Sequence, residues 1–336
     1  ATGSIGQNTI DLIRRTPDSY DVVALTGAGN IAQLAKDAKA LKAEIAVTAR
    51  EDLLDDLRDA LSGSGIEAAA GSEAITEAAS RPADWTMSAI IGAAGLAPGL
   101  AALRQGGTLA LANKESLVCA GALIMGEAER NGATILPVDS EHSAVFQALV
   151  GEDMTAVERV IITASGGAFR DWPLEDLRNA TLDQASNHPN WDMGAKISVD
   201  SATMMNKGLE LIEAHHLFPV GLDKIRIIVH PQSVIHSMVE YLDHSTLAQL
   251  GPSDMMVPIA SCLAWPERME SPCEPLDLAK IGELSFFAPD EERFPATRLA
   301  REACEEGGAA PAVLNAANEV AVQGFLDSRI GFLDIA

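Results

Sequence analysis

Two carboxylates separated by one residue, Asp139 and Glu141, are the first side chains in this sequence whose spacing could support chemistry. They follow the apolar run 135–138, where a buried strand would end. A carboxylate pair in such a place can bind a metal ion or act in acid–base catalysis. The same residues, with Ser140 between them, can instead cap a helix, because acidic and hydroxyl side chains satisfy free backbone N–H groups there. Both interpretations stay open on these residues alone.

A second polar set, Asn206, Lys207 and Glu210, occurs at helical spacing. If a helix begins near Ser201, these three side chains share one side of it. They could form an ordinary surface ion pair, which contributes little to stability. The apolar residues among 204–212 leave little of the helix solvated, and this favours polar side chains that point into a site.

Glycine-rich turns provide further candidates for ligand binding. Thr2-Gly3-Ser4-Ile5-Gly6 leads directly into a helical pattern at 9–13. Glycines at a helix start let backbone amides approach a pyrophosphate, although an ordinary tight turn has the same sequence. The turn Ser165-Gly166-Gly167 follows an apolar strand in the same way. Because the chain opens inside the first motif, we expect a strand to precede Ala1.

The loop Gly27-Ala28-Gly29-Asn30 bears on the choice between NAD and NADP. It lacks the acidic residue that commonly binds the ribose 2′-hydroxyl of NAD, and it lacks a basic residue for the 2′-phosphate of NADP. The loop therefore permits NADP without selecting it. Arg50, after the next strand, is a possible substitute donor.

Alternating strands and helices must position these residues. Short spacings of this kind predict βαβ units, a parallel sheet and ligand binding at the carboxyl ends of the strands. Gly92, Asn113-Lys114 and Asp139 should then lie on one rim. The predicted strands are 20–26, 44–48, 87–91, 108–111 and 157–164, and the predicted helices are 31–41, 51–61, 96–105 and 115–130.

Composition excludes several classes of protein. The 336 residues include 48 acidic and 24 basic side chains, a formal charge of −24, which disfavours nucleic acid and anionic membranes as partners. Four dispersed cysteines fit neither a zinc site nor a disulfide scaffold. No window reaches about 18 consecutive apolar residues, and the start does not resemble a signal peptide. We therefore expect a cytoplasmic protein with reduced thiols.

Taken together, the motifs resemble the 1-deoxy-D-xylulose 5-phosphate (DXP) reductoisomerase family over essentially the whole chain. Individually some are generic, but the ordered set is specific. The segments that carry the resemblance are 1–6 (ATGSIG), 112–116 (ANKES), 137–142 (PVDSEH), 187–193 (NHPNWDM), 201–210 (SATMMNKGLE) and 230–237 (HPQSVIHS).

The resemblance implies an α/β fold with a Rossmann-like parallel-sheet nucleotide domain, an α+β catalytic domain and a truncated C-terminal helical domain. The implied divisions are 1–138 for NADPH binding, 139–264 for catalysis with a flap at about 186–194, 265–290 as a linker, and 291–336 as the start of the helical domain. The implied protein is a cytoplasmic homodimer that continues beyond Ala336. Its implied reaction is the NADPH- and metal-dependent conversion of the sugar phosphate DXP to 2-C-methyl-D-erythritol 4-phosphate (MEP).

The resemblance also implies roles for individual residues. The catalytic set is Lys114, Asp139, Glu141 and Glu210, of which the three carboxylates would bind Mg²⁺, Mn²⁺ or Co²⁺. The substrate-binding set is Lys114, Ser140, Glu141, Ser165, His188, Trp191, Ser201, Asn206, Lys207, Glu210, His236 and Met255, with Met193 also in the flap. The cofactor-binding set is Thr2, Gly3, Ser4, Ile5, Asn30, Asn113, Glu115 and Gly194.

Some alternatives remain open at this point. The segment 187–194 has no periodicity and contains Trp191, so it could be a flap that closes over a ligand or a surface loop whose tryptophan packs on the core. Another NAD(P)-dependent dehydrogenase acting on a phosphorylated hydroxy-ketone would not need three carboxylates. A non-enzymatic nucleotide-binding module would need none of them for ligand binding.

Overall fold

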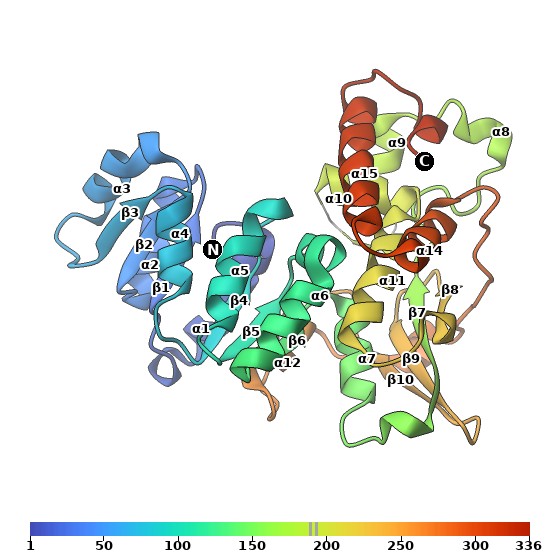
Figure 1. Ribbon diagram of the computed structural model, residues 1–336, viewed down its shortest axis with the longest axis horizontal. Helices are drawn as coiled ribbons and strands as arrows, with labels where there is room; N and C mark the ends of the chain where they lie inside the picture. Colours follow the sequence, from blue (N-terminus) through green and yellow to red (C-terminus); the bar gives the residue numbers. More distant parts are fainter. Residues whose placement is uncertain (188–189, 192–193) are drawn as a thin grey trace. The chain divides into compact units, whose positions relative to one another are not determined.

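The computed structural model describes residues 1–187, 190–191 and 194–336, and it forms two compact units (Figure 1). Unit 1 comprises Ala1–Ser116, Ala122–Asp139 and Met255–Cys273. Unit 2 comprises Leu117–Gly121, Ser140–Asp254 and Glu274–Ala336.

This division differs from the boundary expected at residue 264, because helix α12 (Met256–Ala264) packs within unit 1. The Cys262 thiol donates to the carbonyl of Pro137 at 3.3 Å, and the Trp85 indole donates to the carbonyl of Cys262 at 3.0 Å. Burial raises the pKa of the Cys262 thiol to about 12, so it remains a neutral hydrogen-bond donor. These contacts explain why 255–273 belongs to unit 1.

Unit 1 contains two separately hydrogen-bonded parallel sheets, where the sequence suggested a single one. Their strand orders are β1-β2-β3 and β4-β5-β6. The strands are β1 (Ala24–Gly27), β2 (Ile45–Thr48), β3 (Glu67–Ala70), β4 (Trp85–Ser88), β5 (Thr108–Leu111) and β6 (Thr134–Pro137). The alternation of strands and helices, and with it the α/β class, is confirmed.

The helices of unit 1 connect these parallel strands. They are α1 (Ser4–Arg15), α2 (Ile31–Leu41), α3 (Leu54–Leu61), α4 (Ser72–Ala79), α5 (Leu96–Leu103) and α6 (Lys114–Asn131). Residues 117–121 of α6 belong to unit 2. The short 3₁₀ helices are η1 (Pro17–Ser19), η2 (Glu51–Leu53) and η3 (Gly92–Gly95). Leu34 of α2 and Leu57 of α3 are fully buried in one apolar cluster. Amphipathic spacing thus places the helices as predicted, with ends that shift by a few residues.

The carboxyl ends of β4, β5 and β6 form one rim, as expected for a parallel sheet. The Asn113 side chain, just after β5, donates to the carbonyls of Ile90 at 2.5 Å and Gly92 at 3.0 Å beyond β4. Asp139 follows β6 two residues after its end. The predicted rim is therefore present.

Unit 2 is built on a four-stranded mixed sheet of order β10-β9-β7-β8. Its strands are β7 (Val157–Ala164), β8 (Ile225–Val229), β9 (Ile235–Tyr241) and β10 (Thr246–Leu250). Strands β7 and β8 are parallel, and β9 is antiparallel to both of its neighbours. Val160 and Ile162 of β7 are fully buried in the cluster that includes Leu209 and Ile212, so the sheet provides a rigid floor.

The helices of unit 2 are α7 (Ser140–Ala148), α8 (Leu174–Leu177), α9 (Leu182–Ser186), α10 (Ala195–Ala202), α11 (Met205–Leu217), α13 (Leu278–Ile281), α14 (Ala296–Glu306) and α15 (Ala310–Leu326), with η4 (Met154–Ala156), η5 (Leu222–Lys224) and η6 (Phe332–Asp334). Helix α14 packs against α11 and α15 (Figure 1). In the described part of the chain, no helix combines the length and apolar composition needed to cross a membrane.

A helix start near Ser201, as considered from the sequence, is wrong. Helix α10 already ends at Ala202, and α11 begins at Met205 after Met204 adopts a left-handed conformation, φ 64°. The Thr203 hydroxyl accepts from the N–H of Met205 at 3.3 Å and supports this break. Asn206, Lys207 and Glu210 nevertheless share one helix.

Candidate active site

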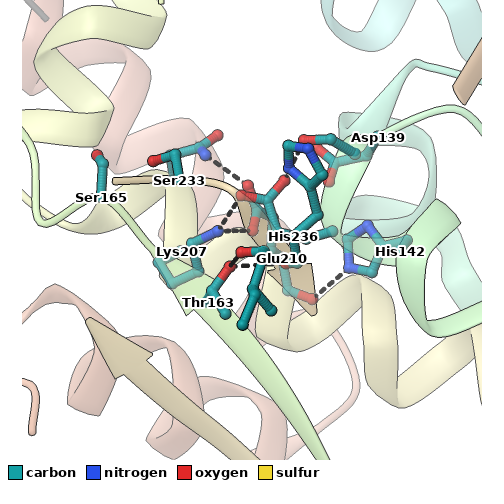
Figure 2. Close-up of polar contacts among 12 residues, drawn as sticks. Asp139, His142, Thr163, Ser165, Lys207, Glu210, Ser233 and His236 are labelled. Atoms are coloured by element: carbon teal, nitrogen blue, oxygen red, sulfur yellow. Dashed lines mark hydrogen bonds and ion pairs between the residues drawn. The ribbon is translucent and has the colours of Figure 1, made fainter. Parts of the chain in front are cut away.

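Helices α7 and α11 bring Glu141 and Glu210 together within unit 2. The Lys207 ammonium donates to Glu141 Oε1 at 2.8 Å. It also forms an ion pair with Glu210 (Figure 2). One carboxylate oxygen of Glu141 lies within 4.8 Å of one of Glu210. Glu141 thus joins Lys207, 66 positions further along the chain, and Glu210 in a single charged cluster.

Burial makes this cluster more than an ordinary surface ion pair. The side chain of Glu210 is 1% exposed, that of Lys207 5% and that of Glu141 18%. Two carboxylates this close repel each other strongly where water is excluded, and the ammonium between them offsets that repulsion. Their oxygens are also the hard donors that a divalent cation such as Mg²⁺ binds. The donor set therefore fits such an ion.

Neighbouring side chains orient both glutamates. The Asn206 amide donates to Glu210 Oε1 at 2.5 Å, and the Ser140 hydroxyl donates to Glu141 Oε2 at 2.5 Å. Ser140 begins α7 and Glu141 lies in its first turn, so the helix-start interpretation was right about their position. The helix-start interpretation does not account for the contact that the Glu141 carboxylate makes with Lys207.

The structure adds two buried residues that the sequence interpretation missed. His142 Nε2 lies 2.9 Å from the backbone carbonyl of Glu210 (Figure 2). His142 Nδ1 lies 3.8 Å from Glu213 Oε2. The His142 side chain is fully buried, and that of Glu213 is 4% exposed. The available signals were that His142 directly follows Glu141 and that Glu213 lies one helical turn after Glu210. Together they fix α7 against α11.

In unit 1, the structure joins Lys114 to Asp139, with Lys114 Nζ 3.3 Å from Asp139 Oδ2. Both side chains are largely buried, at 15% and 17% exposed. Asn113 caps α6, because its Oδ1 accepts from the N–H of Ser116 at 2.8 Å, and its amide also donates to Glu115 at 3.2 Å. Lys114 and Asp139, which were expected to lie on one rim, are thus in contact.

Two serines of the predicted substrate-binding set, Ser165 and Ser201, come from different segments of unit 2. Ser165 follows β7, and its hydroxyl accepts from the N–H of Gly167 at 3.1 Å. Ser201 lies in the last turn of α10, shortly before Asn206 and Lys207 begin α11. Ser201 therefore lies shortly before the N-terminus of α11, where free backbone N–H groups are available to an anion.

The residues expected to line the substrate fall in different parts of the structure. The Trp191 and His236 rings lie 6.3 Å apart between centroids, and His236 Nε2 contacts the carbonyls of Gly251 and Pro252 at 3.2 and 3.3 Å. Met255 belongs to unit 1 rather than to the unit of His236. His188 and Met193 lie outside the described residues.

The predicted cofactor residues stand at helix starts. Gly3 caps α1, which begins at Ser4 and includes Ile5, directly after Thr2. Asn30 caps α2 through its side chain, which accepts from the N–H of Gln33 at 3.2 Å, and Gly194 caps α10. Arg50 is exposed and paired with Asp52 at 2.5 Å, so it is already engaged as a donor.

Comparison with known proteins places these motifs in one family. Family models described as 1-deoxy-D-xylulose 5-phosphate reductoisomerase match residues 1–121, and models of its C-terminal domains match 135–218 and 250–336. The reductoisomerase of Ruegeria pomeroyi is 63% identical over 336 residues, which is all of this chain and 85% of that protein. That of Zymomonas mobilis is 60% identical, over all of this chain and 87% of that protein.

Solved structures agree with the sequence comparison. The Zymomonas mobilis reductoisomerase in complex with NADPH superposes with a TM-score of 0.95 at 58% identity, covering 99% of this chain and 87% of that one. A DOX-P reductoisomerase in complex with NADPH, fosmidomycin and magnesium also gives 0.95, at 46% identity, covering 100% and 85%. This chain belongs to the 1-deoxy-D-xylulose 5-phosphate reductoisomerase family.

Proposed function

We propose that this protein converts DXP to MEP in isoprenoid biosynthesis, using NADPH and a divalent cation. The observation that carries the proposal is the buried cluster of Glu141, Lys207 and Glu210, in a chain whose relatives over its full length are reductoisomerases. The reaction rearranges the carbon skeleton of a ketose to a branched aldehyde. A hydride from NADPH and a proton then reduce that aldehyde to an alcohol.

The proposed metal ligands are Asp139, Glu141 and Glu210. Magnesium is bound in solved structures of relatives, and carboxylate oxygens suit Mg²⁺, Mn²⁺ and Co²⁺ alike. When bound, such an ion polarises the substrate oxygens as a Lewis acid and fixes their geometry. Carboxylate oxygens of Glu141 and Glu210 lie within 4.8 Å of each other, and this supports the proposal that both bind the same metal ion.

The substrate would be held at both of its ends. Lys114 and Ser140 are proposed to hold the oxygens near the reacting carbons, and Lys114 already lies beside Asp139. Ser165, Ser201, Asn206 and Lys207 are proposed to bind the phosphate, where the Lys207 charge offsets the acidity of the chain. Binding a group remote from the reacting carbons orients them for reaction.

The residues that cover the substrate are also proposed from the family motif. They are Trp191, His188 and Met193 in the flap at about 186–194, with His236 and Met255 lining the site. The proximity of the Trp191 and His236 rings supports the pairing of flap and site floor. A closed flap would exclude water from the reduction step.

NADPH would bind in the domain at 1–138, with the catalytic domain at 139–264, a linker at 265–290 and the helical domain from 291. Relatives bind NADPH in solved structures. The proposed contacts are Thr2, Gly3, Ser4, Ile5, Asn30, Asn113, Glu115 and Gly194. Helix starts at Gly3 and Gly194 support this proposal, because free backbone amides there suit phosphate groups.

We further propose that the protein is a cytoplasmic homodimer that acts on a small sugar phosphate. Light scattering coupled to gel filtration measures the assembly directly. A mass of twice the monomer supports the dimer, and a monomer under assay conditions refutes it.

The decisive test of the activity is NADPH consumption with each component omitted in turn. We expect consumption only when both DXP and Mg²⁺ or Mn²⁺ are present, with MEP as the product. Folded protein that is inactive under these conditions would refute the proposal. Activity that survives EDTA would favour a metal-independent dehydrogenase, and the same assay with NADH measures cofactor preference.

A further inference from the structure

A buried carboxylate outside the cluster described above links two helices of unit 2. Asp200, on α10, is 2% exposed, and it accepts from Lys196 Nζ at 2.9 Å and from Asn318 Nδ2 at 2.8 Å. Lys196 is one helical turn earlier on α10. Asn318 belongs to α15, 118 residues further along the chain.

The orientation of the Asn318 amide is set by its hydrogen bond to Asp200. It is 3% exposed, and its Oδ1 has no hydrogen-bond partner among the described residues, so the side chain leaves one acceptor unsatisfied in order to donate to Asp200. The opposite orientation of the amide would place Oδ1 against the carboxylate and repel it. Leaving a buried acceptor unsatisfied costs stability, so packing alone does not account for an asparagine here.

Apolar residues already attach α15 to the rest of unit 2. Val322 and Phe325 of α15 are buried in one cluster with Val199 and Ala202 of α10. An apolar residue at position 318 would extend that cluster but would take a hydrogen-bond donor away from the buried Asp200 carboxylate. The Asp200–Asn318 hydrogen bond instead fixes one orientation of α10 against α15.

Helix α10 in turn determines the positions of both candidate phosphate-binding serines. Ser201 directly follows Asp200 in the sequence. The turn after Ser165 packs against the same backbone, because a Cβ added to Gly167 would lie 2.4 Å from the carbonyl oxygen of Ser201 and 2.8 Å from the Cα of Ala202. Gly167 is also left-handed, φ 71°. A shift of α10 would therefore displace both serines.

We propose that Asn318 is a positioning residue that acts through Asp200 to hold α10, and hence Ser201 and Ser165, in the geometry that binds the substrate phosphate. This inference rests on the proposed function. It gives the helical segment at 310–326 a specific role in substrate binding, through the contact of Asn318 with Asp200.

The test compares Asn318→Asp, Asp200→Asn and the double variant, with Gln323→Glu as the control. Asn318→Asp places two carboxylates together, whereas the double variant restores a donor–acceptor pair with its direction reversed. Gln323→Glu makes the same amide-to-carboxylate change on the exposed face of α15. Thermal unfolding monitors folding in every variant.

We expect Asn318→Asp to raise KM for DXP by at least about tenfold, because a misplaced binding group loses remote binding energy. The KM for NADPH and the value of kcat should change by less than about threefold. The double variant should recover most of the loss, since the two sites are coupled. Gln323→Glu should behave as wild type.

An unchanged KM for DXP in folded Asn318→Asp would overturn the inference. A general loss that affects both substrates equally and is not rescued by the double variant would also overturn it. If Asn318→Asp does not fold, Asn318→Leu removes the donor without adding charge, and the same KM criterion applies.

Failure of the proposed function would be recognised separately, as absence of turnover by the wild type. In that case, calorimetric titration with inorganic phosphate tests the inference without catalysis. Weaker phosphate binding by Asn318→Asp than by wild type, with rescue in the double variant, would support it. Equal affinities would overturn it.

Discussion

At the scale of single residues, Lys207 is the group on which the candidate site most depends. It is the ammonium that contacts both Glu141 and Glu210, and all three side chains are largely buried. Removing one member of a buried ionic cluster leaves the others uncompensated, which typically costs about 3–5 kcal/mol. Lys207 should therefore influence stability as well as the proposed substrate binding, and the two effects must be measured separately.

We expect Lys207→Gln to lower kcat/KM for DXP by at least about a hundredfold, because the variant loses the charge proposed to bind the phosphate and leaves two carboxylates without their cation. Steady-state kinetics with NADPH and Mg²⁺ measure the loss. Lys280→Gln, at an exposed position, is the matched control. Wild-type values of KM and kcat in this variant would show that Lys207 does not contribute to the active site.

The two glutamates should control the response to metal. We expect Mg²⁺ to raise the melting temperature of wild type, because a ligand that binds only the folded state stabilises it. Glu141→Gln and Glu210→Gln should lose most of that increase, whereas Glu283→Gln at an exposed position should keep it. Differential scanning calorimetry with and without Mg²⁺ measures the shift. An increase retained in both site variants would contradict the proposed ligand set.

His216 should make stability depend on pH. Burial, together with the neighbouring His215, lowers its pKa below the ordinary value near 6.5. The unfolded chain therefore takes up this proton at a higher pH than the folded protein does. Stability is complete above about pH 6.5 and declines as pH falls through the lowered folded-state pKa.

His216→Gln should flatten this part of the stability curve, because glutamine does not titrate. Chemical denaturation of both proteins between about pH 8 and 5 measures it, with His244→Gln, at an exposed histidine, as the control. Parallel curves for wild type and His216→Gln would mean that His216 does not contribute to the acid sensitivity.

At the scale of elements, helix α6, which is kinked at Ala120 (φ −144°), contains two glycines in opposite environments. A Cβ added to Gly121 would lie 2.2 Å from the His216 ring, whereas one added to Gly126 would meet nothing within 4 Å. Glycine in a helix interior ordinarily costs about 0.5–1 kcal/mol relative to alanine. The same substitution should therefore have opposite effects on stability at the two positions.

We expect Gly121→Ala to lower the free energy of unfolding by about 1–3 kcal/mol, because the imidazole must move. Gly126→Ala should raise it by about 0.5–1 kcal/mol. Urea denaturation of the pair gives the comparison within one helix. Stabilisation by both substitutions would show that His216 moves aside at little cost.

Element boundaries also show how far the sequence predicts the structure. The helix at 31–41 and the strands at 108–111 and 157–164 were predicted to the residue, because apolar periodicity and clear turn residues define them. The break at Met204 was not, since methionine rarely adopts a left-handed conformation and nothing in its sequence signals one. Contacts with distant residues determine the backbone there.

The candidate site divides in the same way. The roles of Glu141, Lys207 and Glu210 were predicted from the family motifs, since their spacing alone also fits a helix cap and a surface ion pair. The contact between Asp200 and Asn318 was not, because it joins residues 118 positions apart that carry no shared motif. Long-range packing between helices is what a single sequence leaves undetermined.

At the scale of the whole molecule, the 48 acidic and 24 basic residues produce a negative field that concentrates cations and opposes anionic ligands. The range of that field depends on salt, since the Debye length falls from about 30 Å at 0.01 M to about 8 Å at 0.15 M. At low salt, charges across the protein surface contribute to cation binding. At higher salt, mainly the nearby carboxylates do.

We therefore expect Mg²⁺ affinity to fall several-fold when KCl is raised from about 0.01 to 0.15 M. The KM for the anionic substrate at saturating Mg²⁺ should change less, because Lys207 supplies a local positive charge. Calorimetric titration with Mg²⁺ at each salt concentration measures the first effect. Replacing KCl with sucrose of equal osmolality controls for water activity. A salt-independent Mg²⁺ affinity would mean that the distributed charge does not reach the site, and that the local carboxylates alone determine cation binding.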